Sequence, residues 1–215
     1  MIKLYSYWRS SAAYRVRIGL NLKNIEHEIV PVNMLKDGGE QHSDAYREVN
    51  PQGLVPTLVD DDLTLTQSLA ILEYLDEKYP QAPLLPADTA GRARARQLAQ
   101  LVACDIHPLN NLRVLKYLKR ELNVEDAAKD SWYRYWIMLG FEAFESAITK
   151  IDRVGPYCLG EEITLVDLCL IPQMYNAHRF DLPLQHYPTL CTIEQVCLEL
   201  EAFQLASPEK QIDAS

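Results

Sequence analysis

Short apolar runs and helical periodicities alternate along the first eighty residues. Residues 2–5 and 28–30 are rich in side chains that favour strands, so each run is predicted as a β-strand. Between them, a pair of serines precedes apolar side chains at helical spacing, which predicts a capped helix. The apolar face of this helix is formed by Ala13, Val16 and Leu20. The connection is long enough for a right-handed crossover, so the two strands are expected to be parallel.

A hairpin and another helix are predicted next. Residues 57–59 and 63–65 have strand-forming patterns on either side of the acidic turn 60–62. Ser68 is expected to cap a helix with apolar side chains at helical spacing. The order β-α-β, a less regular stretch and then β-β-α predicts a small α/β domain over residues 1–80.

The second part of the chain has a different pattern. Three prolines interrupt every periodicity and indicate a linker, namely Pro80, Pro83 and Pro86. From there on, apolar residues recur at helical spacing, as in 98–102, 137–148 and 193–200. We therefore expect an all-helical second domain over residues 88–215. Its tail, 207–215, is polar and is expected to be loosely ordered.

Composition and charge narrow the possible functions. The 215 residues are 48% hydrophobic and 24% charged, which is typical of a packed globular protein. A net charge of −9 argues against sequence-independent binding to nucleic acid and leaves small molecules or proteins as partners. No apolar run is long enough to cross a membrane and no signal-like segment follows Met1, so a cytoplasmic location is expected. The five cysteines form no C-x-x-C pair, so neither a zinc site nor a disulfide framework is indicated.

The junction of the first strand and the first helix is a candidate site. Arg9, Ser10 and Ser11 lie where free backbone N–H groups and the positive end of the helix dipole gather. An anionic sulfur is favoured at such a place, and a serine hydroxyl can donate a hydrogen bond to it. The alternative is that a serine only caps the helix.

Two further positions in the first domain suit a peptide-like ligand. A cis Val55–Pro56 bond would turn the N–H and C=O of Val55 outward, where an extended peptide can pair with them. The alternative is an edge proline without function. Gln67 and Ser68 open the next helix, where an amide, a hydroxyl and free N–H groups suit a carboxylate. Here the alternative is simple capping.

The second half contains polar residues with less obvious roles. His107, Asn111 and Arg113 fall in one helical stretch, and the histidine has no partner at metal-ligand spacing, so no metal site is expected. The basic residues within 116–120 are interpreted as a solvated helix face. The pattern assigns no role to Arg179. The sequence also lacks the common phosphate-loop, serine-hydrolase and zinc-protease motifs.

Several segments, in their order and spacing, resemble the zeta-class glutathione transferases over nearly the whole chain. The longest are residues 10–18 (SSAAYRVRI), 50–58 (NPQGLVPTL) and 67–71 (QSLAI). Shorter ones are 35–39, 84–86, 164–172 and 187–189. The resemblance implies an α+β protein with the glutathione transferase fold and a homodimeric assembly. Residues 1–80 would form a thioredoxin-like, glutathione-binding domain of order βαβαββα, and residues 88–215 an all-helical, substrate-binding domain.

The resemblance also implies roles for single residues. Ser10 and Ser11 would surround the glutathione sulfur, and the backbone of Val55 would pair with the cysteinyl unit. Gln67 and Ser68 would hold the γ-glutamyl carboxylate. The remaining site would be lined by Gln41, His107 and Asn111.

One departure from the family pattern bears on the chemistry. Ala12 stands where the family commonly has a cysteine, so a protein thiol at that position is not required. The glutathione thiolate is left as the nucleophile. A branch of the family that isomerises maleylpyruvate shares residues 104–108 and 110–111 with this chain. The substrate-binding arginines of that branch correspond to Arg9, Arg113 and Arg179, which suits a dicarboxylate because a guanidinium pairs with a carboxylate in plane.

The implied activity is the glutathione-dependent isomerisation of maleylacetoacetate to fumarylacetoacetate in tyrosine and phenylalanine breakdown. The thiolate would add to the double bond, rotation would follow, and elimination would return glutathione, so no metal, nucleotide or flavin is expected. The alternatives are maleylpyruvate isomerisation, general glutathione conjugation or dehalogenation, and a non-catalytic binding module of the same fold. The expected partners are glutathione, a small dicarboxylate and a second copy of the chain, with no nucleic acid and no membrane.

Overall fold

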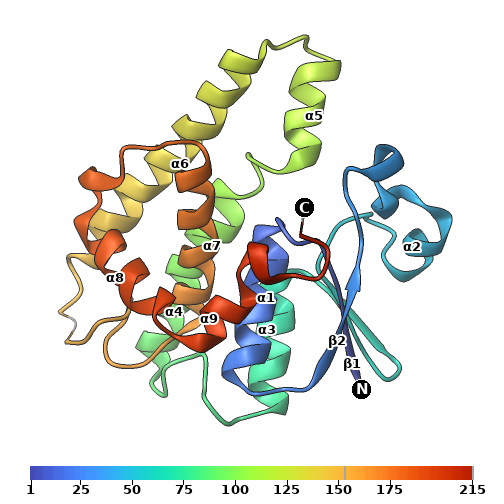
Figure 1. The fold of residues 1–215 in the computed structure, drawn as a ribbon. Coiled ribbons are helices and arrows are strands. Elements are labelled where there is room, and N and C mark those ends of the chain that lie inside the picture. Colours follow the sequence, from blue (N-terminus) through green and yellow to red (C-terminus); the bar gives the residue numbers. More distant parts are fainter. Residues whose placement is uncertain (153, 215) are drawn as a thin grey trace. The chain divides into compact units, whose positions relative to one another are not determined.

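The computed structural model describes residues 1–152 and 154–214, so residues 153 and 215 of the predicted helical domain lie outside it. The chain divides into two compact units (Figure 1). Unit 1 consists of Met1–Leu84 and Leu198–Ser215, and unit 2 of Leu85–Cys197. Among the described residues, no helix is both long and apolar enough to cross a membrane.

Unit 1 contains a four-stranded sheet in the order β2-β1-β3-β4. The strands are β1 (Ile2–Ser6), β2 (His27–Pro31), β3 (Thr57–Asp60) and β4 (Leu63–Thr66). β1 and β2 are parallel, with Leu4 opposite Ile29, whereas β3 is antiparallel to both β1 and β4. The parallel pair and the hairpin predicted from the sequence are therefore confirmed.

The helices of unit 1 complete a thioredoxin-like arrangement. They are α1 (Ser11–Leu22), α2 (Asp44–Val49), α3 (Ser68–Lys78) and α9 (Glu201–Ala206). Short 3-10 turns lie at Lys36–Gly38, Glu40–His42 and Pro208–Lys210. From β1 to α3 the order is βαβαββα. The predicted fold of the N-terminal part is therefore confirmed.

Helix α1 lies at the centre of unit 1 and is buried from Ser11 to Leu20. Both α3 and α9 pack against it, so even its polar positions have no exposed face. Arg15 and Arg17 are each only 1% exposed. An interior helix of this kind fixes the position of its own N-terminus, which is the candidate site at Ser10.

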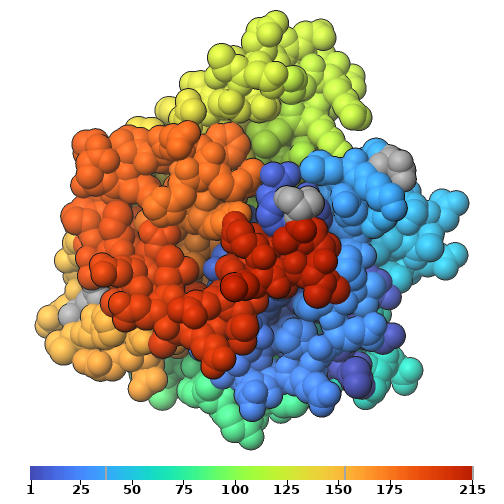
Figure 2. All heavy atoms as spheres, in the orientation of Figure 1, coloured from blue at the N-terminus to red at the C-terminus, as the bar shows by residue number. Residues whose placement is uncertain are grey.

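The C-terminal segment is placed differently from the sequence prediction, which assigned residues 88–215 to the helical domain and expected a loose tail. Residues from Leu198 onward belong to unit 1, and Figure 2 shows this red segment packed against the blue N-terminal part of the same unit. Hydrogen bonds hold it there, because Asn21 donates to the carbonyl oxygen of Ala202 at 3.0 Å and the Tyr14 hydroxyl to that of Phe203 at 3.4 Å. Helix α9 is thus held by partners on α1, and in the tail the Asp213 carboxylate accepts a hydrogen bond from the N–H of Trp8 at 3.0 Å.

Unit 2 is helical in its described residues, as predicted. Its elements are α4 (Thr89–Gln100), a π-helical turn (Leu101–Ile106), α5 (Leu112–Arg120), α6 (Asp126–Ile148), α7 (Leu165–Arg179), a 3-10 turn (Leu184–His186) and α8 (Pro188–Leu198). The apolar stripe of α6 is fully buried and consists of Ile137, Phe141, Phe144 and Ile148. Helix α7 packs against α4 and α6 and is buried over most of its length.

Candidate active site

Ser10 is the N-cap of α1. Its Oγ accepts a hydrogen bond from the N–H of Ala13 at 3.2 Å, and its own N–H donates to the carbonyl oxygen of Tyr7 at 2.9 Å. Capping uses a lone pair of the hydroxyl, so the hydroxyl hydrogen is still available for a ligand. Ser11 follows as the first residue of the helix and is 7% exposed. The capping interpretation of Ser10 is thus correct and is compatible with a second role in binding.

Arg9 precedes this cap and is held by its neighbour. Its guanidinium carbon lies 4.9 Å from the centre of the Trp8 ring, which is a cation–π distance. The N-terminal end of α1 therefore carries a positioned cation, a serine hydroxyl and the positive end of a helix dipole. All three favour an anionic ligand.

The Val55–Pro56 peptide bond is cis, as the sequence analysis anticipated. The carbonyl oxygen of Leu54 accepts hydrogen bonds from the Tyr46 hydroxyl at 2.6 Å and from the Asn50 amide at 2.7 Å. Burial raises the pKa of Tyr46, so its hydroxyl remains a donor. Within the described part of the chain, neither the N–H nor the C=O of Val55 forms a backbone hydrogen bond. The segment is thus fixed up to Leu54, and the N–H and C=O of Val55 have no backbone partner among the described residues.

The start of α3 differs from the expectation that Ser68 caps the helix. The N-cap is Gln67, and its side chain makes no capping bond. Ser68 is the first residue of the helix, and its hydroxyl accepts a hydrogen bond from the buried Arg15 guanidinium at 3.2 Å. Gln67 has a φ of 70°, a conformation that costs about 1–3 kcal/mol for a residue with a side chain and that clusters at ligand sites. The first N–H groups of α3 are therefore left without a side-chain cap and suit a carboxylate.

Gln41 lies near the same region of unit 1. The Gln67 amide donates to the side chain of Gln52 at 3.3 Å. Gly53, which follows Gln52, has a φ of 62° and lies close to Gln41, because a Cβ on Gly53 would come within 2.9 Å of the Gln41 carbonyl oxygen. The Gln41 side chain is 2% exposed, and its Oε1 has no hydrogen-bond partner among the described residues. A buried oxygen without a partner is costly, so it indicates a missing donor.

In unit 2, three predicted residues lie between α4 and the start of α5. The N–H of His107 bonds to the carbonyl oxygen of Val102 at 3.0 Å, which closes a π-helical turn of the kind often found at functional sites. Asn111 is the N-cap of α5, and its Oδ1 accepts the N–H of Arg113 at 3.1 Å. This bond uses the carbonyl end of the Asn111 amide and leaves its NH₂ group as a donor. The side chain of Arg113 is exposed.

Helix α6 anchors the turn that precedes α5. The Trp132 indole N–H donates to the carbonyl oxygen of Leu109 at 2.9 Å, and the Asn110 amide donates to that of Tyr133 at 3.1 Å. These bonds fix the backbone directly before Asn111. The direction in which α5 begins is therefore set by α6.

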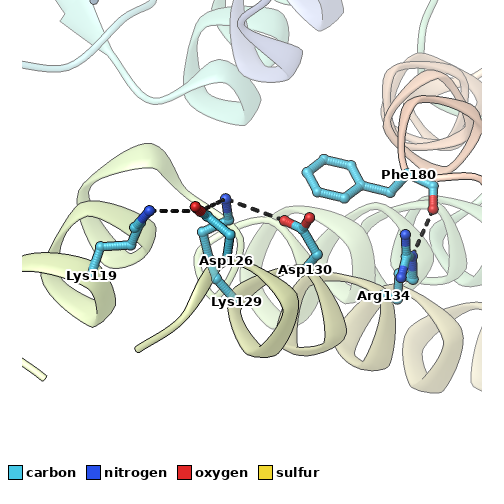
Figure 3. A network of polar contacts seen from close by, with 6 residues as sticks. All are labelled: Lys119, Asp126, Lys129, Asp130, Arg134 and Phe180. Carbon is cyan, nitrogen blue, oxygen red and sulfur yellow. Dashed lines mark hydrogen bonds and ion pairs between the residues drawn. The ribbon is translucent and has the colours of Figure 1, made fainter. Parts of the chain in front are cut away.

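The same stretch of α6 anchors the end of α7, where Arg179 lies. The Tyr133 ring stacks on Phe180 with a centroid distance of 3.7 Å. The Arg134 guanidinium donates to the Phe180 carbonyl oxygen at 2.8 Å, as Figure 3 shows. Arg179 donates to the Asn176 side chain at 3.3 Å, and its guanidinium carbon is 5.7 Å from the Phe180 ring. Burial raises the pKa of Tyr133 to about 12, against the opposing effect of the Arg179 charge.

Sequence reasoning missed this role of α6. Its signal is the aromatic run WYRYW at residues 132–136, in which Tyr133 continues the buried face of α6. The three consecutive residues 132–134 hold the approach to α5 and the end of α7. Arg113 and Arg179 are thereby anchored to the same part of unit 2.

Ion pairs also tie the far end of α5 to α6. Lys119 lies 2.7 Å from Asp126, which is also 3.0 Å from Lys129, and Lys129 pairs in turn with Asp130 at 3.2 Å (Figure 3). The two lysines lower the pKa of Asp126 to about 2, so the carboxylate is charged at any working pH. Lys119 is exposed, in agreement with the solvated face predicted around it.

The predicted site residues therefore form two sets. Unit 1 contains Arg9, Ser10, Ser11, Gln41, Val55, Gln67 and Ser68, and unit 2 contains His107, Asn111, Arg113 and Arg179. A surface hollow of about 540 Å³, lined by α6 together with His186 and Tyr187, contains none of them. Within residues 1–152 and 154–214, no group of His, Cys, Asp or Glu is arranged to hold a metal ion.

Comparisons with known proteins point to one family. Residues 4–83 match the model of the glutathione S-transferase N-terminal domain. A probable maleylacetoacetate isomerase from Vibrio cholerae is 50% identical, over 98% of this chain and 97% of the relative. A solved bacterial maleylpyruvate isomerase, described as a zeta-class glutathione transferase, is 43% identical with a TM-score of 0.96, covering 99% of this chain and 100% of the other. The maleylacetoacetate isomerase of Methylobacterium extorquens, solved with malonate and glutathione bound, is 41% identical with a TM-score of 0.95, covering 99% of each chain.

Proposed function

We propose that this chain, which belongs to the zeta class of the glutathione transferases, converts maleylacetoacetate to fumarylacetoacetate with glutathione as cosubstrate. The predicted family, the fold and the enzyme class of glutathione-dependent isomerase are confirmed by full-length relatives at 41–50% identity. The binding of glutathione is supported by a relative that contains it. The single observation that carries the proposal is the 50% identity to a probable maleylacetoacetate isomerase over 98% of the chain.

Glutathione is proposed to bind unit 1 along three groups that the structure leaves open. Its sulfur would lie at the start of α1, where Ser10 or Ser11 donates a hydrogen bond and the helix dipole favours the thiolate. Its cysteinyl backbone would pair with the open N–H and C=O of Val55. Its γ-glutamyl carboxylate would accept N–H groups at the uncapped start of α3, beside Gln67. The unpartnered Oε1 of Gln41 would accept a donor from the same ligand.

The dicarboxylate is proposed to bind the arginines. Arg113 is exposed at the start of α5 and Arg179 at the end of α7, and both segments are anchored by α6. A guanidinium offers two parallel N–H donors to a carboxylate, which is the geometry that a diacid requires. Arg9 would add a third cation beside the reacting thiolate, and His107 and Asn111 would line the remaining surface of unit 2.

The proposed reaction breaks no bond permanently. The thiolate adds to an alkene carbon of the cis enone, and the electrons of the π bond move to the carbonyl oxygen to give an enolate. The former double bond is now single and rotates. The enolate electrons then return, the C–S bond breaks and the thiolate leaves, so glutathione is regenerated with the trans product. The arginines stabilise the enolate charge as it develops.

The protein supplies no competing thiolate in the described part of α1, because that helix contains no cysteine. In unit 2, burial raises the pKa of the Cys197 thiol, and nearby Asp167 and Glu194 add to this effect. Cys197 is therefore a protonated core residue. We propose that the nucleophile comes from glutathione.

The assay measures isomerisation of maleylacetoacetate and of maleylpyruvate by the purified protein, each with and without glutathione. We expect turnover only with glutathione and a higher kcat/KM for maleylacetoacetate. A preference for maleylpyruvate would instead support the second candidate, which the solved structure with a TM-score of 0.96 favours. No turnover of either acid would refute the proposed chemistry.

The assembly and location are part of the proposal. We propose a homodimer, so light scattering should give twice the chain mass of 24.6 kDa. A single chain mass would contradict it. Because the reaction needs glutathione in its reduced form, we propose the cytoplasm as the compartment.

A further inference from the structure

The last described residues of the chain contact the loop that leads into Ser10. The carboxylate of Asp213 accepts a hydrogen bond from the backbone N–H of Trp8 at 3.0 Å, although 205 positions separate the two residues. A charged acceptor makes such a bond shorter and stronger than a neutral one. Asp213 is partly buried, whereas its neighbour Ile212 is 77% exposed and turned to solvent.

The other side of the Trp8 residue is held by Arg17. This buried guanidinium donates to the carbonyl oxygen of Trp8 at 3.0 Å and to that of Tyr7 at 3.4 Å. It also donates to the carbonyl oxygen of Ala206 at 2.9 Å, the last residue of α9. The N–H of Trp8 is therefore bonded to Asp213 of the C-terminal segment, and its C=O is bonded to Arg17, which also binds the carbonyl oxygen of Ala206 in that segment.

We propose that the C-terminal segment positions the thiol site, and that Asp213 is the positioning residue that acts on Trp8. The loop from Tyr7 to Ser10 is short, and a turn bond from the Ser10 N–H to the Tyr7 carbonyl oxygen closes it. Once Trp8 is fixed, the orientation of the Ser10 cap is fixed with it. The Trp8 ring also carries the Arg9 guanidinium at 4.9 Å. One carboxylate at the end of the chain thus sets two groups that face the reaction.

This inference rests on the proposed function, because it assigns a role in glutathione and dicarboxylate binding. Asp213 does not touch either ligand in this account, so its loss should leave the reaction possible but the site less ordered. A small misplacement of a reacting group costs a large factor in rate. We expect Asp213→Ala to lower kcat/KM on the order of tenfold, with a higher pKa of the bound glutathione thiol. Asp213→Asn retains an acceptor oxygen for the Trp8 N–H and should recover most of the loss.

The experiment compares the wild type with Asp213→Ala, Asp213→Asn and the control Ile212→Ala, all as full-length protein. The ultraviolet absorbance of enzyme-bound thiolate, titrated with pH, gives the thiol pKa, and steady-state kinetics separate kcat from KM. Urea unfolding shows whether a variant is less stable. A purely structural role would change unfolding and leave the thiol pKa in place.

The outcomes separate this inference from the proposed function. If the wild type binds no glutathione, the proposed function fails first. If the wild type binds and turns over, but Asp213→Ala keeps the same thiol pKa and a kcat/KM within about twofold of the wild type, the positioning role is overturned. A raised thiol pKa in Asp213→Ala, with Asn close to wild type and Ile212→Ala unchanged, would support it.

Discussion

Replacing Ser10 separates its capping role from its proposed role at the glutathione sulfur. Ser10→Ala removes both the acceptor for the Ala13 N–H and the hydroxyl donor. Ser10→Asp retains a capping side chain of similar strength but has no hydrogen to donate and repels a thiolate. The two variants should therefore differ in stability, whereas both should raise the pKa of the bound glutathione thiol.

The magnitudes follow from the two interactions. Loss of a serine cap costs about 1 kcal/mol, which lowers Tm by roughly 2–4 °C for a chain of this size. A hydrogen bond to a charged group contributes about 1.5–3 kcal/mol, so its loss should raise the bound thiol pKa by about one to two units. We expect both effects in Ser10→Ala, and in Ser10→Asp only a raised thiol pKa, which should rise further because the carboxylate repels the thiolate. Ser11→Ala, whose hydroxyl does not cap α1, shows how much of the thiol shift belongs to the second serine.

The assay titrates the ultraviolet absorbance of the bound thiolate and measures thermal unfolding on the same samples. Asp88→Ala serves as a matched control, because Asp88 caps α4 in unit 2 through the N–H of Gly91 at 2.8 Å. It should lose a similar stability and leave the thiol pKa unchanged. An unchanged thiol pKa in Ser10→Ala, Ser11→Ala and the double variant would refute the proposed activation of glutathione.

Three further predictions concern the carboxylate sites and a buried phenol. Arg113→Ala and Arg179→Ala should each raise the KM for the dicarboxylate on the order of tenfold or more, with little change in the KM for glutathione. The control Arg120→Ala, at an exposed position, should change neither KM. Equal effects on both substrates in steady-state kinetics would contradict the assignment. Gln67→Ala should raise the glutathione KM and leave the kcat at saturation nearly unchanged, and a loss confined to kcat would argue against a binding role. Tyr133 has a pKa raised to about 12 in the fold against about 10 when unfolded, so its contribution to stability is complete below about pH 10 and is lost as the pH rises to about 12. In urea unfolding, the wild type should lose up to about 2–3 kcal/mol of its free energy of unfolding over this pH range through Tyr133, and Tyr133→Phe should not show this loss. Identical pH profiles for the two proteins would refute the prediction.

Local patterns in the sequence predicted the sheet of unit 1 well. The strand runs, the crossover and the hairpin are short-range features in which hydrophobic pattern and turn chemistry agree. The same holds for the apolar stripe of α6, which the structure buries completely. The sequence analysis considered a cis bond at Val55–Pro56 as one of two possibilities, and the structure has this bond.

Polar residues in the interior were the main source of error. Arg15 and Arg17 are charged residues to which the sequence pattern assigned no role, yet both are 1% exposed. Their partners are distant in sequence, because Arg15 donates to Ser68 and Arg17 to the carbonyl oxygen of Ala206. No local pattern encodes these bonds. The first of these bonds holds the Ser68 hydroxyl at the start of α3, and the second holds the end of α9.

The candidate site depended on the family resemblance to different degrees. Ser10 and Gln67 could be proposed from helix starts alone, since both lie where free N–H groups gather. Arg113 and Arg179 could not, because an exposed arginine on a helix is ordinarily solvated. In the structure, they differ from other exposed arginines because the segments that carry them are anchored to the same residues of α6, namely Trp132, Tyr133 and Arg134. Their roles as carboxylate ligands stay predictions.

The central claim is that the thiolate of glutathione performs the isomerisation by adding to the double bond and leaving it. The most direct measurement compares the conversion of maleylacetoacetate with glutathione, with S-methylglutathione and with no thiol. We predict turnover only with glutathione, at an undiminished glutathione concentration, and competitive inhibition by the methylated form. Conversion supported by S-methylglutathione, or conversion without any thiol, would contradict the account.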